Sequence, residues 1–341
     1  MPKEFFAPSK EQVAFRETET SRLDVGHVRV KSLFGASKHG TEMSLYRGYG
    51  SARGSFDREL RLFRPDTNGD AYPCSLGNMC VGEVVELGPQ TTQLKIGDRV
   101  FSHGPFREEH CWPETVRLLP EGLPWQTAVC HDPAEFAFGA IRDGHLRLGD
   151  SVAVFGMGAI GLLVIQFAQM AGAHPIIAVD PLELRRTVGK QCGADVILDP
   201  VSCDVGLEIK QLTEGRGADV CIEYSGHHLG LQGALRSVAY NGVVVAGAYP
   251  GPYAAGLDLG AEAHMNRPRI VFSRSNSDPN PDHPNWNRER IVAETWRLLK
   301  TGQFETEAIV QPIVPFEQLA EHYPKIATNP ETSVKLGVSF V

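Results

Sequence analysis

The sequence has no run of about 18 uninterrupted apolar residues, the length a helix needs to cross a membrane. It also has no basic run longer than a pair such as Arg185–Arg186, and the net charge of the 341 residues is −8. This balance argues against nucleic acid or an anionic membrane as a partner. The first residues lack the basic-then-apolar order of a signal peptide, so we expect a cytoplasmic protein.

The seven cysteines form no Cys-x-x-Cys pair, and their odd number without a secretion signal argues for reduced thiols. Hydrophobic residues make up 42% and charged residues 22% of the chain, as in ordinary globular proteins. Disordered and fibrous classes are therefore excluded. The length is sufficient for two domains.

A glycine-rich segment in mid-chain carries the strongest functional signal. Gly156, Gly158 and Gly161 follow an apolar strand and open an apolar helix, which is the context of a dinucleotide-binding turn. The first glycine permits the tight turn, the second admits a pyrophosphate, and the third allows close packing. The helix N-terminus then offers unpaired amides to the phosphates. The segment predicts cofactor contacts from Gly156, Met157, Gly158, Ala159, Ile160 and Gly161.

Asp180 ends the next predicted strand, 180 − 161 = 19 positions after the last glycine. A carboxylate there accepts hydrogen bonds from the ribose hydroxyls and repels a 2′-phosphate, which favours NAD over NADP. Arg185 and Arg186 lie one helical turn further and are candidates to serve a phosphate; Arg185 and Ser225 complete the predicted cofactor contacts. In the alternative interpretation the glycines only form a turn and Asp180 caps the following helix.

From about residue 148 the pattern alternates short apolar strands with helices, which is typical of a parallel sheet covered on both faces. Six strands with crossover helices predict a complete doubly wound α/β fold. The predicted strands are Val152–Phe155, Ile176–Val179, Val196–Leu198, Val220–Glu223, Val243–Ala246 and Ile270–Ser273, and the helices are Ala159–Ala171, Leu182–Gln191, Val205–Leu212 and Leu229–Val238.

The first 145 residues instead contain short, partly alternating strand candidates separated by Gly-, Pro- and Asp-containing turns, which predicts a β-rich domain. The candidates are Val28–Leu33, Gly82–Leu87 and Arg99–Phe101. Near the other end, the polar segment Asn276–Asn287 predicts a lid or a crossing between domains. An amphipathic helix is expected at Arg288–Leu299.

The order of these parts resembles the medium-chain dehydrogenase/reductase superfamily, especially its polyol, sugar and threonine dehydrogenase branch. The resemblance rests on Gly82–Gly88, Gly97–Val100, the turn at Gly156, Cys192–Asp195 and Pro315–Leu319. It implies a GroES-like β-rich catalytic domain (residues 1–145 and 285–341), a Rossmann NAD-binding domain (146–284) and a cleft between them. It also implies a homodimer or homotetramer that assembles through the edge of the cofactor sheet.

Members of that branch commonly bind a catalytic zinc, and this sequence departs from their pattern. His39-Gly40-Thr41-Glu42 stands where the family shows Cys-x-Ser/Thr-Asp, and Gly77-Asn78-Met79 stands where it shows Gly-His-Glu. The third ligand position carries His131-Asp132-Pro133, so His39 and Asp132 are the only adequate ligands left. The structural zinc lobe of four cysteines retains only Cys111. We therefore predict chemistry without zinc; the alternative is a weak or unusual metal site at His39 and Asp132.

Without a Lewis acid, hydrogen-bond donors and a proton relay have to stabilise the charge that develops on the substrate oxygen. Thr41 matches the hydroxyl that begins the family's relay, and His39 and Asn78 occupy two former ligand positions. Asp132 is expected to orient His39 or accept a proton. Glu42 matches a carboxylate that orients the groups in contact with substrate.

Each of these residues has a simpler structural interpretation. His39 fits a surface loop, Thr41 fits a turn cap, and Asn78 fits a turn beside Gly77. Asp132 before Pro133 fits a helix N-cap. His103 and His110 lie in a region that often lines the cleft and are otherwise solvated loop residues.

The sequence thus predicts an NAD-dependent oxidoreductase that interconverts a hydroxylated small molecule, such as a sugar or polyol, and its ketone. One alternative is a zinc-free quinone or enoyl reductase of the same superfamily, against which Asp180 argues. Alternatives from other classes are a non-catalytic nucleotide-binding protein and a methyltransferase, which the preceding β-rich domain disfavours.

Overall fold

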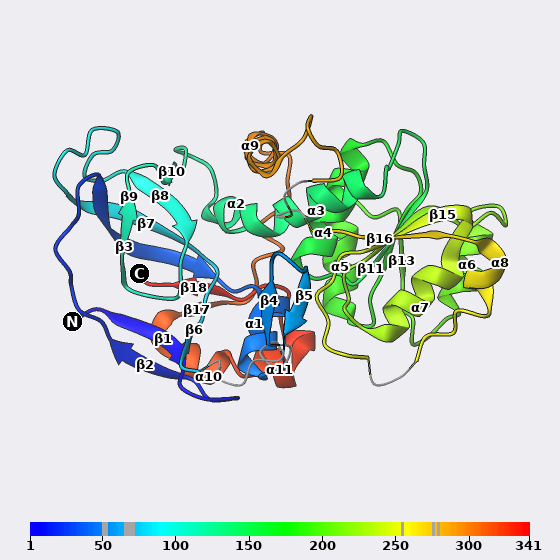
Figure 1. The fold of residues 1–341 in the computed structure, drawn as a ribbon, viewed down its shortest axis with the longest axis horizontal. Helices are drawn as coiled ribbons and strands as arrows, with labels where there is room; N and C mark the ends of the chain where they lie inside the picture. Colours follow the sequence, from blue (N-terminus) through cyan, green and yellow to red (C-terminus); the bar gives the residue numbers. More distant parts are fainter. Residues whose placement is uncertain (50–53, 65–71, 254–255, 275–276, 278–279) are drawn as a thin grey trace. The chain divides into compact units, whose positions relative to one another are not determined.

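The computed structural model describes residues 1–49, 54–64, 72–253, 256–274, 277 and 280–341 (Figure 1). It separates into two compact units: unit 1 comprises residues 1–129 and 310–341, and unit 2 comprises residues 130–309. These limits differ from the domain boundaries predicted at 145 and 285, and the functional roles of the domains remain a prediction. Among the described residues, no helix is both long enough and apolar enough to cross a membrane.

Unit 2 contains a six-stranded parallel sheet in the order β13-β12-β11-β14-β15-β16. This is the doubly wound order in which the first strand lies at the centre and the chain then reverses direction. The predicted α/β fold class is therefore confirmed. The strands are β11 (Val152–Phe155), β12 (Ile176–Val179), β13 (Val196–Leu198), β14 (Ala218–Glu223), β15 (Val238–Ala246) and β16 (Arg269–Phe272).

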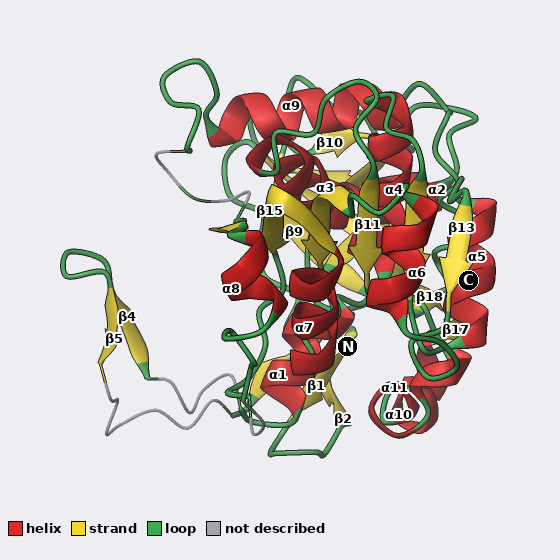
Figure 2. Cartoon of the chain, turned by 90° about the vertical axis from the view of Figure 1, so that its right-hand side faces the viewer, coloured by secondary structure: helices red, strands yellow, loops and turns green. Residues whose placement is uncertain are grey.

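Side chains alternate between the two faces of this sheet, and each face has its own helices (Figure 2). Ile177 and Val179 pack with the apolar residues of α6 (Val205–Leu212) and α7 (His228–Ser237). Ala178 instead faces Gly189 of α5 (Glu183–Gln191), beside α4 (Ala159–Met170). The helices α3 (His131–Asp143) and α9 (Arg288–Leu299) pack on each other, and α8 (Glu262–Asn266) packs on β15.

The described part of the segment predicted as a lid is packed on α3. Asn276 and residues 278–279 lie outside the described residues. Trp286 is stacked between two guanidinium groups, with Arg142 3.8 Å and Arg290 4.0 Å from the ring centroid. Asp282 forms an ion pair with Arg142. Cation–π stacking therefore anchors residues 282–286 within unit 2.

Unit 1 is built on a seven-stranded sheet in which both ends of the chain take part. The long strand β3 pairs with β7 on one side and with β9 and then β18 on the other. All three strands predicted in this region are present and longer than expected. The sheet contains β3 (His27–Ala36), β7 (Met79–Leu87), β8 (Arg99–His103), β9 (Glu109–Pro113), β10 (Arg117–Leu118), β17 (Ile313–Pro315) and β18 (Gly337–Ser339).

Smaller elements complete unit 1. A three-stranded sheet comprises β2 (Ala14–Glu17), β1 (Lys3–Ala7) and β6 (Cys74–Ser75), and a separate hairpin comprises β4 (Ser55–Asp57) and β5 (Leu62–Arg64). The short helices are α1 (His39–Tyr46), α2 (Trp125–Val129), α10 (Leu319–His322) and α11 (Lys325–Thr328), with 3₁₀ turns at Phe316–Gln318 and Pro330–Thr332.

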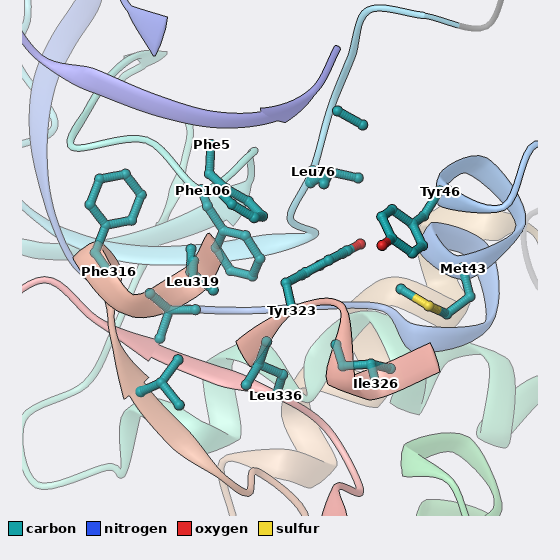
Figure 3. Packing of buried hydrophobic residues seen from close by; sticks show 13 residues of the cluster. Phe5, Met43, Tyr46, Leu76, Phe106, Phe316, Leu319, Tyr323, Ile326 and Leu336 are labelled. Carbon is teal, nitrogen blue, oxygen red and sulfur yellow. The ribbon is translucent and has the colours of Figure 1, made fainter. Parts of the chain in front are cut away.

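An aromatic cluster joins α1, β1 and the C-terminal helices of unit 1 (Figure 3). Tyr323 is fully buried at its centre, with its ring edge-on to Phe5 at 5.4 Å and to Tyr46 at 5.7 Å between centroids. Each fully buried aromatic ring of this kind stabilises the fold by about 1.5–3 kcal/mol through burial alone. The cluster therefore fixes α1, which carries three predicted site residues.

Candidate functional site

The glycine turn after β11 has the geometry that its sequence requires. Gly156 has a φ of +93°, in the left-handed region that favours glycine. A Cβ added there would lie 2.5 Å from the amide nitrogen of Ser225, so the turn is pressed against the segment after β14. The strands β11 and β14 adjoin at the point where the strand order reverses, which is where ligands bind in open α/β sheets.

Gly158 and Gly161 have opposite surroundings. A Cβ added at Gly158 meets no atom within 4 Å, whereas one at Gly161 would lie 1.9 Å from the carbonyl oxygen of Gly156. Gly158 is also the N-cap of α4 and provides no side-chain cap for the first amides of the helix. The turn therefore presents open space beside helix amides, which suits a phosphate group.

Asp180, buried with 3% of its surface exposed, connects two consecutive turns of unit 2. Its Oδ2 accepts a hydrogen bond from the amide of Met157 at 2.7 Å, and its Oδ1 accepts one from the amide of Leu182 at 2.8 Å. Both oxygens keep further lone pairs, so these bonds leave capacity for hydroxyl donors. The Met157 side chain is buried in the core, and Ala159 and Ile160 are partly buried.

The two arginines after Asp180 have different environments. Arg185 is partly buried; burial lowers its pKa, and the Asp180 carboxylate acts in the opposite direction. Arg186 donates from Nη1 to the carbonyl oxygen of Asp180 at 2.8 Å, and its Nη2 lies 3.3 Å from Oδ2 of Asp199.

A carboxylate that the sequence prediction missed organises the segment after β14. Glu223 is buried and accepts hydrogen bonds on Oε1 from the Ser225 hydroxyl and, at 2.9 Å, from the Gly226 amide. The Ser225 oxygen in turn accepts from the amide of His227 at 3.1 Å. Burial raises the pKa of Glu223 despite these hydrogen bonds. The available signal in the sequence was an acidic residue at the end of the predicted strand Val220–Glu223, whose other residues are apolar.

His39 is the first residue of α1 and not a surface-loop histidine. Its Nε2 accepts a hydrogen bond from the amide of Leu336 at 2.9 Å, so this nitrogen carries no proton and the ring is neutral. The interpretation as a loop residue is therefore wrong. The bond attaches the start of α1 to the C-terminal segment of the chain.

The Glu42 side chain forms hydrogen bonds with the residues that precede His39 and Asn78. Its carboxylate, 4% exposed, accepts hydrogen bonds from the amide of Lys38, from the amide of Gly77 at 3.1 Å and from the Tyr323 hydroxyl at 2.9 Å. Burial raises the pKa of Glu42, and the three hydrogen bonds oppose this rise. Glu42 thus holds Lys38, Gly77 and Tyr323 in place relative to one another.

Asn78 lies between β3 and the end of β8. The backbone amide of Asn78 donates to the carbonyl oxygen of Ala36 at 3.2 Å, and its backbone carbonyl accepts from the amide of Gly104 at 3.1 Å. Thr41 is exposed in the first turn of α1, whose N-cap is Lys38, so Thr41 is not a cap. His39, Thr41 and Asn78 therefore belong to adjoining segments of unit 1.

Asp132 belongs to unit 2, where it is the second residue of α3 and 6% exposed. The N-cap position of this helix is Cys130, so the prediction that Asp132 caps it is wrong. The preceding helix α2 ends at Val129, and the chain enters α3 directly with helical backbone at Cys130. The neighbouring His131 is buried, with Nε2 3.1 Å from the carbonyl oxygen of Val292.

His103 is exposed at the end of β8, whereas His110 is buried in unit 1 with its ring stacked on Trp112 at 4.6 Å between centroids. The solvated-loop interpretation of His110 is therefore wrong, and its place beside a cleft stays a prediction. Burial lowers the pKa of His110 to about 3, so the ring is neutral.

Lys335 is a second buried charge that the sequence prediction missed. It is 2% exposed, and its Nζ donates to the carbonyl oxygen of Ser37 at 2.6 Å. Its positive charge acts to lower the pKa of Glu42. A lone lysine within the apolar run Val334–Val338 was the available signal.

The comparisons with known proteins agree with this geometry. Residues 50–119 match the model of the alcohol dehydrogenase GroES-like domain, and residues 159–282 match that of the zinc-binding dehydrogenase family. D-guloside 3-dehydrogenase of Escherichia coli K12 is 40% identical over 349 aligned positions, which cover 99% of this chain and 100% of that protein. This chain belongs to the medium-chain dehydrogenase/reductase superfamily.

Two solved structures share the fold of this superfamily member. An alcohol dehydrogenase of Escherichia coli CFT073, solved with NADH, aligns with a TM-score of 0.76 and 18% identity, covering 99% of both chains. A dehydrogenase of Sinorhizobium meliloti 1021, bound to NADP, aligns with a TM-score of 0.77 and 20% identity, also covering 99% of both chains. The fold therefore accommodates either nicotinamide cofactor.

Zinc is part of the name of one matching family. His39 Nε2 is used by the Leu336 amide, and the Met79 side chain is 2% exposed in the core. Among the described residues, no group of three or more His, Cys, Asp or Glu side chains is arranged to hold a metal.

Proposed function

We propose that the protein transfers a hydride between NAD(H) and a secondary alcohol of a sugar or polyol, forming or reducing the corresponding ketone. The open space beside Gly158, next to uncapped helix amides and the Asp180 carboxylate, carries the cofactor assignment. The sugar assignment rests on the likeness over the full length to D-guloside 3-dehydrogenase.

In the proposed reaction, unit 2 binds the cofactor through Gly156–Gly161, Asp180, Arg185 and Ser225. Unit 1 provides the groups that act on the alcohol oxygen. Thr41, exposed on α1, accepts the hydroxyl proton as its own hydroxyl proton leaves to solvent, while Asn78 donates a hydrogen bond to the oxygen. His39, whose Nε2 accepts a hydrogen bond from the Leu336 amide, positions the start of α1 and does not carry the proton.

Glu42 has a positioning role in this proposal. Its three hydrogen bonds hold Lys38, Gly77 and Tyr323, so the residues next to them, His39 and Asn78, keep their orientation. We further propose that no zinc takes part. Elemental analysis of the purified protein, together with turnover that survives prolonged treatment with a chelator, tests this point; stoichiometric zinc whose removal abolishes turnover would contradict it.

A pair of glycine variants tests the cofactor assignment. Gly158→Asp places a carboxylate in the open space proposed for the pyrophosphate, so NADH binding measured by fluorescence titration should be lost. Gly256→Asp is the matched control, because a Cβ there also meets no atom within 4 Å. If Gly158→Asp binds NADH as the wild type does, the cofactor assignment fails.

The substrate class is tested by incubating the protein with NAD and a panel of glycosides, polyols and simple alcohols while NADH absorbance is followed. Thr41→Val should lower kcat strongly with little change in the Kd for NADH, and Thr41→Ser should restore most of the activity. NADPH-dependent reduction of quinones or enones in the absence of alcohol oxidation would instead favour the reductase alternative.

We also propose that a second copy of the chain docks on the edge of the parallel sheet. The edge strand β16 exposes 83% of Phe272 and 44% of Ile270, and an open edge of this kind favours pairing between chains. Sedimentation of the wild type and of Phe272→Asp tests the resulting dimer or tetramer. The expectation that the protein is cytoplasmic stays a prediction from the sequence pattern.

A further inference from the structure

The ends of β12 and β13 place two acidic residues next to each other. Val179 and Leu198 are register partners, and Asp180 and Asp199 directly follow them. The amide of Asp180 donates to the carbonyl oxygen of Leu198 at 3.3 Å, which continues the pairing beyond the strands. Asp180 is the residue proposed to meet the ribose, so Asp199 lies beside the proposed ribose site.

Arg186 of α5 bridges these two strand ends. Its Nη1 donates to the carbonyl oxygen of Asp180 at 2.8 Å, and its Nη2 lies 3.3 Å from Oδ2 of Asp199. The Arg186 side chain is 16% exposed and that of Asp199 is 26% exposed. The other carboxylate oxygen of Asp199 accepts from the amide of Val201 at 2.9 Å. One oxygen of Asp199 is thus fixed by the Val201 amide, and the other forms the ion pair with Arg186.

We propose that Asp199 determines cofactor choice by retaining Arg186, so that the guanidinium does not serve a 2′-phosphate. This inference rests on the proposed function, in which Asp180 binds the ribose of NAD. An arginine beside the 2′ position is the group that NADP-binding folds use for the phosphate. Here Arg186 provides such a guanidinium, but the Asp199 carboxylate already lies beside its Nη2.

Charge and geometry both support this role. A guanidinium binds phosphate best through two parallel N–H donors, and the contacts with Asp180 and Asp199 use donors from both terminal nitrogens. The Asp199 carboxylate also repels an incoming phosphate directly. Removing its charge leaves Arg186 beside the ribose site with an uncompensated positive charge.

The variant Asp199→Asn isolates this effect. Its amide oxygen can still accept from Val201, but the variant no longer provides a negative charge for Arg186. The Kd values of NADH and NADPH are measured by fluorescence titration at one fixed ionic strength. We expect about a tenfold gain in NADPH affinity, the size of one charge-assisted hydrogen bond, with less than about a twofold change for NADH.

The double variant Asp199→Asn/Arg186→Gln is the control. It should lose the gain for NADPH, because the inference requires the guanidinium that Asp199→Asn would release. Asp199→Ser provides a second test if Asp199→Asn unfolds, since a serine hydroxyl can also accept from the Val201 amide. Thermal unfolding of every variant shows which of them retain the fold.

The outcomes separate the inference from the function on which it rests. An NADPH-to-NADH affinity ratio that is unchanged in both single variants overturns the inference alone. So does a gain for NADPH that persists after Arg186→Gln is added. A wild-type protein that binds neither NADH nor NADPH overturns the proposed function and this inference with it.

Discussion

The Tyr323 hydroxyl donates a hydrogen bond to the Glu42 carboxylate over 2.9 Å, although 281 positions separate the two residues in the sequence. Both side chains are buried, and the Glu42 carboxylate also holds the amides of Lys38 and Gly77. Three distant segments of unit 1 therefore share one carboxylate. A buried acceptor of this kind is costly to remove, because its donors lose their partner together.

Substitutions at this pair should destabilise the fold unequally. Tyr323→Phe removes one of three donors and should cost about 1–2 kcal/mol in the free energy of unfolding. Glu42→Leu leaves the two amides and the hydroxyl without their acceptor and should cost about 3–5 kcal/mol. Urea unfolding followed by tryptophan fluorescence measures both values.

The double variant Glu42→Leu/Tyr323→Phe should cost clearly less than the sum of the single variants, because the two residues contact each other directly. Tyr240→Phe, at a tyrosine that is 64% exposed, is the control and should change stability by less than about 0.5 kcal/mol. Strict additivity would show that the hydrogen bond contributes nothing measurable.

His110 should make stability depend on pH below neutrality. Its folded pKa of about 3 lies below the ordinary value of 6.5, because burial disfavours the charged ring. The unfolded chain therefore binds a proton that the folded chain does not, and stability falls as the pH drops below 6.5. The expected slope is about 1.4 kcal/mol per pH unit until the pH approaches 3.

The variant His110→Phe keeps a flat ring beside Trp112 and removes this titration. Any packing cost of the larger ring is independent of pH, so the difference in slope between wild type and variant is the relevant measurement. Unfolding free energies at several pH values between neutrality and about pH 5 provide it. Equal slopes in the two proteins would contradict the buried, neutral state of His110.

Two glycines of the turn after β11 should respond in opposite ways to alanine. Gly161→Ala should destabilise unit 2 by about 2–3 kcal/mol, because its Cβ would lie 1.9 Å from the Gly156 carbonyl oxygen. Gly158→Ala should change stability by less than about 0.5 kcal/mol and still weaken NADH binding, since its Cβ enters open space. Thermal unfolding and NADH titration together distinguish the two effects.

Local patterns predicted the elements of unit 2 closely. The helices at Val205–Leu212 and Arg288–Leu299 and the strand at Val152–Phe155 have the predicted limits. Their apolar spacing and capping residues are local properties, such as the Asp204 and Asn287 side chains that cap the two helices. The Asp132 cap failed because helix α2 leads straight into α3, which no neighbouring residue signals.

The sequence alone determined the order of strands and helices, the glycine turn and its acidic partner Asp180. Each of these depends on what a few consecutive residues allow the backbone to do. The tertiary structure decided which charges are buried and with which partners. Segments far away in the sequence cover Glu42, His110 and Lys335 and exclude water from them. Asp199 lies within ion-pair distance of Arg186 because the strands β12 and β13 pair. Desolvation and pairing depend on the whole fold, so no local pattern predicts them.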